Sequence, residues 1–157
     1  MKYLIIILTL ISLMSCQTKV PKDFAITVDF DGEIYNSETE TLVRSNYMKK
    51  DYHVKIKLTE QQKLELYKFY NKINFLSFPS EFQCDTLKSE RTIPSSSLEI
   101  KIKANGIIKG SRTNSHCTEK IEVKKEKELY EFSDKLQKML DENPVYRNIP
   151  SSDIIKL

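Results

Sequence analysis

Three cysteines and two histidines are the residues of this sequence with the widest chemical range, because they can act as nucleophiles, redox centres or metal ligands. The histidines, His53 and His116, form no His-x-x-x-His or His-Glu-x-x-His pattern, so no metal site is predicted. Cys84 and Cys117 form no Cys-x-x-Cys motif, and His116 adjoins Cys117 in sequence, where side chains tend to diverge. We therefore predict no catalytic residue, no metal and no cofactor, and an enzyme is the less favoured interpretation.

Carboxylates between residues 27 and 38 raise a second possibility, which is calcium binding. The spacing of Asp29, Asp31, Gly32 and Glu38 matches part of an EF-hand loop. The first position of such a loop is Thr27 here, where the ion normally needs Asp, and an alternating segment precedes it where the motif requires a helix. Asp31-Gly32 is also a strong signal for a tight hairpin turn. A β-hairpin is therefore the favoured interpretation.

The first sixteen residues are organised like a secretory signal segment. Lys2 gives a positive start, and the apolar run from Tyr3 to Leu13 is shorter than the ~20 residues that a membrane-spanning helix needs. The run leads into Leu13–Cys16 (LMSC), which resembles the lipobox of bacterial lipoproteins. An ordinary signal peptide with an incidental cysteine, or a buried N-terminal strand, is the alternative.

The resemblance implies that residues 1–15 are cleaved and that Cys16 is the site of lipid attachment. Two or three acyl chains bury enough methylene groups, at ~0.8 kcal/mol each, to make the anchor permanent. Residues 16–23 would then form a lipidated tether. Gln17 is not the Asp associated with retention in the inner membrane, so we expect the outer membrane, with the protein facing the periplasm.

Lipidation of Cys16 would leave Cys84 and Cys117 as a pair in an oxidising compartment, where disulfides persist. A bond between them would close a loop of about 33 residues and stabilise the fold by roughly 3–4 kcal/mol on the loop-entropy model. It would also tie the long aperiodic segment 80–96 to the chain before the last helix. A redox or nucleophilic cysteine is the alternative.

The segment Tyr52–Phe78 predicts one strand followed directly by one amphipathic helix. In the strand, apolar residues alternate with His53, Lys55 and Lys57, which gives one apolar and one basic face. Thr59 and Gln62 have the spacing of a helix capping box. One helical face collects the apolar residues Leu66, Phe69, Tyr70, Ile73 and Leu76. Pro79 is expected to end this run.

The remaining periodicities predict further strands near 24–30, 33–35, 40–48, 98–104 and 107–113, and a helix within 120–141. Its core-facing residues would be Leu129, Phe132, Leu136, Met139 and Leu140. Asn105-Gly106 is the best hairpin signal, although a two-residue turn would set Lys109 beside Ile102 on the apolar face. We therefore expect a three-residue loop or bulge that turns Ile108 inward instead. The order predicts an α+β domain over residues 24–157, with five to six hairpin-connected antiparallel strands and two amphipathic helices on one face.

Segments Ile34–Arg44, Phe75–Cys84 and 144–157 resemble small uncharacterised envelope lipoproteins of gram-negative bacteria. That resemblance implies a localisation and no activity. Our first hypothesis is a non-catalytic module that binds an envelope protein through His53, Lys55 and Lys57 or through the Cys84 loop. A formal charge of only +3 disfavours nucleic acid.

Two alternatives use the loop 80–97. One is an envelope enzyme whose site gathers Asp85, Arg91 or His116 in a pocket. The other is an inhibitor that presents the stapled loop to an envelope enzyme. The sequence favours neither over the binding module, and it makes no prediction of oligomeric state.

Overall fold

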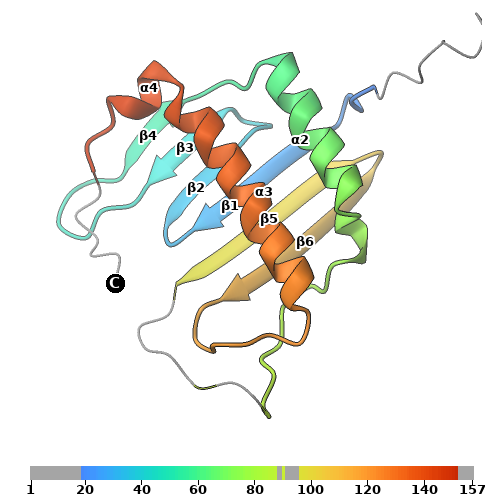
Figure 1. Cartoon of the computed structure of the whole chain (residues 1–157). Coiled ribbons are helices and arrows are strands. Elements are labelled where there is room, and N and C mark those ends of the chain that lie inside the picture. The colour runs from blue at the N-terminus through green and yellow to red at the C-terminus, as the bar shows by residue number, and fades with distance from the viewer. Residues whose placement is uncertain (1–18, 88–89, 91–95, 152–157) are drawn as a thin grey trace, which may run out of the picture.

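In the computed structural model, six antiparallel strands form one sheet that carries two long helices on one face (Figure 1). The structure describes residues 19–87, 90 and 96–151, so Cys16 and Arg91 lie outside the described residues. The elements are β1 (Ala25–Phe30), β2 (Glu33–Asn36), β3 (Thr41–Arg44), β4 (Tyr52–Lys55), α2 (Glu60–Lys72), η1 (Phe75–Ser77), β5 (Ser97–Ala104), β6 (Ile107–Asn114), α3 (Val123–Asp141) and α4 (Pro144–Arg147). This arrangement confirms the predicted α+β class.

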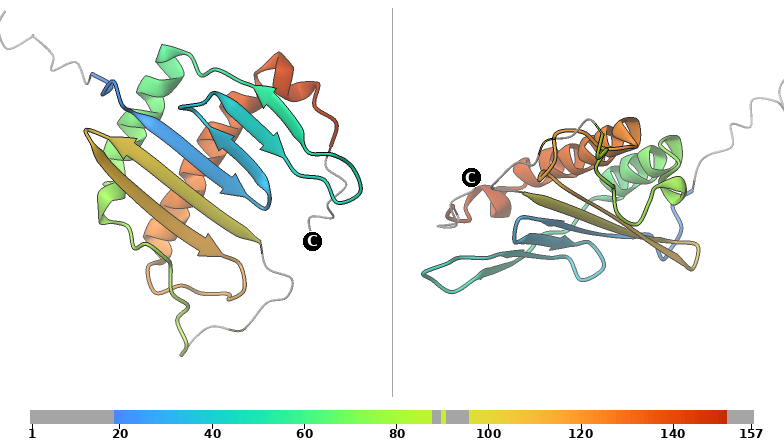
Figure 2. Two further views of the ribbon diagram at one scale, coloured as in Figure 1. Left: turned by 180° about the vertical axis from the view of Figure 1, so that it is seen from behind. Right: turned by 90° about the horizontal axis from the view of Figure 1, so that it is seen from below.

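The strands lie in the order β4-β3-β2-β1-β5-β6, so the chain builds one half of the sheet, crosses over through α2, and then adds β5 beside β1. The turned views show α2 and α3 side by side as a single layer, with the opposite face of the sheet free of helices (Figure 2). We call this second surface the open face. It carries the residues whose side chains alternate with the buried ones.

Two tight turns use residues with positive φ, as two-residue hairpins require. Asp31 and Gly32 have φ of 49° and 84° between β1 and β2, and Asn105 and Gly106 have 52° and 77° between β5 and β6. The Asp29 carboxylate accepts a hydrogen bond from the Gly32 N–H at 3.3 Å. Strands therefore flank this segment on both sides, as the hairpin interpretation predicts, and the helices of an EF-hand are not there.

The β5–β6 hairpin corrects one prediction. Its register is that of a strict two-residue turn, which pairs Ala104 with Ile107 and Ile102 with Lys109. The expected bulge is not present, and Ile108 points away from the core with 71% of its surface exposed. Ser111 and Thr113, which follow Lys109 on the core side of β6, are polar and buried. Their hydroxyl groups form hydrogen bonds with other segments. Ser111 donates to the carbonyl of Pro79 at 2.7 Å, for example.

Helix α2 begins as predicted but ends earlier. Thr59 and Gln62 form the reciprocal capping box. The helix stops at Lys72, well before Pro79, because Asn74 takes a left-handed conformation with φ of 49°. The short helix η1 then turns Phe75 into the core and leaves Leu76 45% exposed, which contradicts the predicted place of Leu76 on the buried face.

The strand before α2 is also shorter than predicted. β4 ends at Lys55, and the chain continues as an irregular segment to Thr59. The alternation persists beyond the strand, because Ile56 and Leu58 are buried while Lys57 is exposed. Two hydrogen bonds hold this extension, since the Ile56 N–H donates to the Glu40 carbonyl and the Ile56 carbonyl accepts from the Tyr35 hydroxyl.

Helix α3 supplies the centre of the core. Its predicted apolar face is confirmed, because all five residues of that face are buried: Leu129, Phe132, Leu136, Met139 and Leu140. The Phe132 ring lies 6.1 Å from that of Phe69 and 6.2 Å from that of Phe75, which joins the two helices to each other. Burying a large aromatic side chain contributes roughly 1.5–3 kcal/mol through the hydrophobic effect, so this contact helps to fix the helix layer.

The folded part of the chain begins earlier than the predicted boundary at Phe24. Val20 packs against the core, and the Phe24 N–H donates to the Pro21 carbonyl at 3.1 Å. The Asp23 carboxylate accepts hydrogen bonds from the N–H groups of Asn105 at 3.0 Å and Gly106 at 2.6 Å. Within the described part of the predicted tether, Val20, Pro21 and Asp23 are thus joined to the domain, Asp23 at the β5–β6 turn.

Candidate functional site

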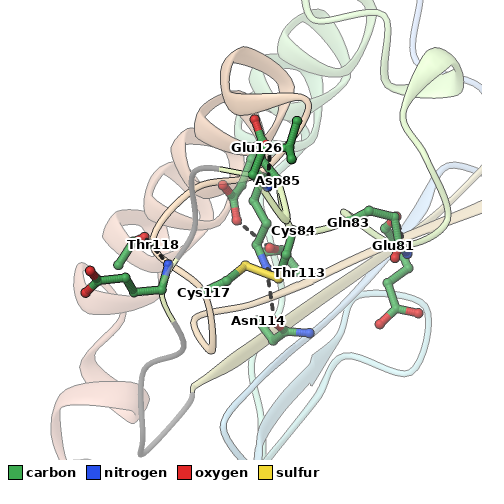
Figure 3. The surroundings of a disulfide bond; sticks show 12 residues. Glu81, Gln83, Cys84, Asp85, Thr113, Asn114, Cys117, Thr118 and Glu126 are labelled. Atoms are coloured by element: carbon green, nitrogen blue, oxygen red, sulfur yellow. Dashed lines mark hydrogen bonds between the residues drawn. A yellow bond between two sulfur atoms is a disulfide. The ribbon is translucent and has the colours of Figure 1, made fainter.

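The clearest chemical feature is the disulfide between Cys84 and Cys117, whose Cα atoms are 6.0 Å apart (Figure 3). Backbone pairing accompanies it on both sides. The Asp85 N–H donates to the Glu119 carbonyl, and the Ile121 N–H donates to the Gln83 carbonyl, each at 3.0 Å. The beginning of the long aperiodic segment is therefore stapled to the chain that leads into α3, as the sequence predicts.

The same segment also pairs with the edge of the sheet before it reaches the disulfide. The Arg112 N–H of β6 donates to the Ser80 carbonyl at 3.0 Å, and the Phe82 N–H donates back to the Arg112 carbonyl at 2.9 Å. Phe82 is buried, with its ring 6.0 Å from that of Phe78. These hydrogen bonds cover part of the β6 edge. They also fix the path of residues 80–82 along that edge.

Lys120 lies against the disulfide and is only 3% exposed. Its Nζ donates to Asn114 Oδ1 at 3.0 Å and lies 3.8 Å from Cys84 Sγ. Burial lowers the pKa of Lys120, while the charges of Glu126 and Glu81 act in the opposite direction. The Glu126 carboxylate also accepts a hydrogen bond from the Thr113 hydroxyl of β6. We call Asn114, Cys84, Cys117, Lys120 and Glu126 the staple cluster.

The chemistry available to the staple cluster depends on its redox state. In the oxidised form the cluster is structural, with the Lys120 amine beside the sulfur of Cys84. In the reduced form the ammonium of Lys120 would stabilise a Cys84 thiolate, which is how a neighbouring cation lowers a thiol pKa. Sequence reasoning missed Lys120, because one lysine in a charge-rich stretch carries no signal of burial.

The residues proposed for an enzyme pocket in the 80–97 loop lie in different settings. One oxygen of Asp85 accepts a hydrogen bond from the Leu87 N–H at 3.1 Å and so caps a local turn. His116 is exposed beside the disulfide, and Arg91 lies outside the described residues. The described residues therefore give this pocket no catalytic arrangement of side chains.

The predicted basic surface lies on the open face, at the β4 edge. His53 and Lys55 are exposed on β4, and Lys57 is exposed just beyond it. Two of the three side chains have partners in neighbouring segments. Lys55 Nζ donates to the Thr39 carbonyl at 2.7 Å, and Lys57 Nζ lies 3.4 Å from a carboxylate oxygen of Glu40.

Across the rest of the open face, cations and carboxylates alternate in short ion pairs. These pairs, with nitrogen–oxygen distances of 2.9 Å, are Lys101–Glu99, Lys103–Glu38 and Arg112–Glu81. All are substantially exposed, so each contributes at most about 1 kcal/mol to stability. Ile34 and Ile108 add exposed apolar area between them. The surface is therefore mixed in charge and is less basic than the β4 residues alone suggested.

At one end of the sheet, a second polar network lies beneath α3 and α4. Arg44 Nε donates to the Glu33 carboxylate, and the guanidinium lies 4.9 Å from the centre of the Tyr146 ring. The Tyr146 hydroxyl donates to the other Glu33 oxygen at 2.8 Å and accepts from Gln137 at 2.7 Å. Arg44 also donates to the carbonyls of Ile149 and Pro150. This network fixes α4 and the following residues to the sheet.

Burial opposes the positive charge of Arg44, but the hydrogen bond and ion pair with Glu33 raise its pKa above the ordinary value. Burial, followed by the hydrogen bond with Glu33, also raises the pKa of Tyr146. Both groups therefore keep their protons near neutral pH. Their contacts make the network a structural one that holds α4 to the sheet.

A shallow hollow of about 140 Å³ lies between the C-terminal half of α2 and the β5–β6 turn. Tyr67, Tyr70, Leu76 and Ile107 are among the residues that line it. Pockets for small organic ligands usually measure ~300–1,000 Å³, so this hollow is small for such a role. The hollow lies near the N-terminal end of the described chain, because Asp23 binds Asn105, which also lines it.

Two further findings concern membrane-spanning helices and metal-binding groups. Among the helices of the described ranges, none is long and apolar enough to cross a membrane. Within the same ranges, no three His, Cys, Asp or Glu side chains are grouped as a metal site would need. In comparisons with protein-family models, with curated proteins and with solved structures, this chain matched none, so its function is inferred from sequence and geometry.

Proposed function

We propose that this chain is an envelope lipoprotein, anchored through Cys16, whose folded domain is a non-catalytic module that binds an envelope protein. The anchor is supported by the lipobox-like Leu13–Cys16 after a short apolar run. It is also supported by the disulfide, since such bonds persist in the oxidising compartments to which lipoproteins are exported. We expect the outer membrane, with the domain on its periplasmic side.

The observation that carries the binding role is the open face of the sheet (Figure 2). Six strands of four to eight residues at ~4.8 Å spacing give it roughly 550 Å², which is close to the area one partner contributes to a transient protein interface. Paired charges around exposed isoleucines match the mixed polarity of non-obligate interfaces. A sheet also presents these side chains on a backbone that is already ordered, so binding needs no backbone ordering.

Photocrosslinking in cells tests this proposal. A photoreactive amino acid at Lys101 on the open face should capture one discrete envelope protein after irradiation. The matched control is the same amino acid at Glu131, which is exposed on α3 on the opposite face. Equal capture from both positions, or no discrete product from Lys101, would contradict the assignment of the open face.

The disulfide staple favours one alternative, an inhibitor that presents the segment after Cys84 to an envelope enzyme. Leu87 is 94% exposed within this segment, and the neighbouring disulfide fixes its base. The photoreactive amino acid at Leu87 separates the two proposals. Capture of a partner from Leu87 but not from Lys101 would favour the inhibitor, whereas the reverse would favour the open face.

A further inference from the structure

The end of the domain that carries the β5–β6 turn must lie close to any anchor on Cys16. Val20 is packed against the core, and Asp23 is hydrogen-bonded to both residues of the turn. Val20 follows Cys16 by only four residues, and four fully extended residues span at most about 14 Å. A lipid on Cys16 would therefore keep Val20, and with it this end of the sheet, close to the bilayer surface.

At this end of the domain, exposed apolar side chains lie on both faces of the sheet. Ile107 and Ile108 directly follow the turn and are 52% and 71% exposed. As neighbours in a strand they point to opposite faces, so the tip of the hairpin is apolar on each side. Leu76, at 45% exposed, lines the hollow that Ile107 also lines. These exposed apolar residues therefore lie at the same end of the domain as Asp23, which binds the β5–β6 turn (Figure 1 shows the two strands and their turn).

The charges near the turn suit an anionic membrane surface. Lys19 and Lys22 lie in the segment next to the anchor, and Lys109 follows the apolar tip. Two carboxylates lie at the same end, where Asp23 binds the N–H groups of the turn and the charge of Glu38 is balanced by Lys103. Each basic side chain close to an anionic bilayer adds about 1 kcal/mol of attraction.

We propose that the β5–β6 tip, with Ile107 and Ile108, inserts into the headgroup region of the membrane that holds the Cys16 lipid. This inference rests on the proposed lipid anchor and adds an orientation to it. The strands would stand away from the bilayer, with the loop between β3 and β4 at the distal end. The anchor alone would allow the domain to tumble, whereas a second contact at the tip would hold the open face to one side.

Tryptophan fluorescence tests the orientation, because the chain contains no Trp and one substitution gives a single reporter. The full lipidated protein is purified from membranes and reconstituted into vesicles of phosphatidylethanolamine and phosphatidylglycerol. Ile108→Trp places the reporter at the tip. Tyr47→Trp is the matched control, since Tyr47 is 84% exposed in the loop at the other end of the sheet. Lipids brominated on the upper acyl chain serve as quenchers.

We expect the emission of Ile108→Trp to shift to shorter wavelength on reconstitution and to be quenched several-fold more strongly than that of Tyr47→Trp. Flotation of the vesicles reports the anchor separately. Protein that floats but shows equal, weak quenching at both positions would overturn the tip contact and leave the anchor in place. Protein that does not float, with no acyl mass on Cys16, would overturn both.

Discussion

Replacing Arg44 with Met should destabilise the fold far more than breaking an exposed ion pair of the sheet. The side chains of Arg44 and Glu33 are only 11% and 12% exposed, so their ion pair is close to fully buried. Met keeps the aliphatic volume and removes the guanidinium. The Glu33 carboxylate then retains only the Tyr146 hydroxyl as a described side-chain donor, and the carbonyls of Ile149 and Pro150 lose theirs.

The size of the effect follows from burial. Removing one partner of a buried ion pair costs ~3–5 kcal/mol, and the residual exposure of this pair places it near the lower end, at about 3 kcal/mol. For a chain of this length that corresponds to a fall of roughly 9 °C in Tm. Urea denaturation and thermal melting of the full mature protein in detergent, with the disulfide oxidised, would measure both.

Two further variants make the test specific. Glu33→Gln combined with Arg44→Met removes the stranded charge but still accepts from Tyr146, so it should recover at least half of the loss. Lys101→Met breaks an exposed pair with Glu99 and should cost under about 1 kcal/mol. If Arg44→Met costs no more than Lys101→Met, or the double variant recovers nothing, the burial argument is refuted.

Three other outcomes are expected. Replacing Cys84 and Cys117 together with Ala should cost roughly 3–4 kcal/mol in urea denaturation, and a loss below about 1 kcal/mol would show that backbone pairing alone holds the segment. In the reduced protein, Lys120→Met should slow alkylation of Cys84 near neutral pH, and unchanged rates would remove the amine from the thiol environment. Hydrogen bonds from the turn, that of Gly106 foremost, lower the pKa of Asp23, so its stabilising effect is complete above pH 3.8 and lost as pH falls through the lower folded value. Asp23→Asn should therefore be less sensitive to acid than the parent in melts at pH 2–5.

The sequence predicts those parts of the fold that depend on local pattern. The capping box at Thr59 and the apolar face of α3 involve residues a few positions apart, and both are confirmed. Leu76 was misplaced because helical periodicity continues through Asn74, whose left-handed backbone ends the regular geometry. Asparagine tolerates that conformation, yet nothing in the pattern required it here.

The errors at β6 and in the polar networks have a different origin. A bulge was expected because a two-residue turn would set Lys109 beside Ile102 on the apolar face. Ser111 is buried all the same, since its hydroxyl bonds to the carbonyl of Pro79, which is 32 residues away in sequence. Arg44 and Tyr146 likewise meet only in the folded chain. Polar partners that are far apart in sequence leave no periodic signal. The disulfide could be predicted because Cys84 and Cys117 are the two cysteines left once Cys16 is assigned to the lipid.

If the open face binds a partner and the β5–β6 tip inserts into the membrane, the height of each residue above the bilayer decides which partners can reach it. With the β5–β6 tip in the headgroups, the strands rise about 25 Å from the membrane, judged from the eight residues of β5 at ~3.3 Å each. Lys103 would then lie near the bilayer, and His53 and Lys55 on the far edge strand would be reached from the side. A partner held in the same membrane would crosslink from Lys103 as efficiently as from Lys101, whereas a soluble periplasmic partner would favour positions nearer Glu99. Comparing capture along β5 would therefore show whether the face binds a membrane-anchored protein or a free one.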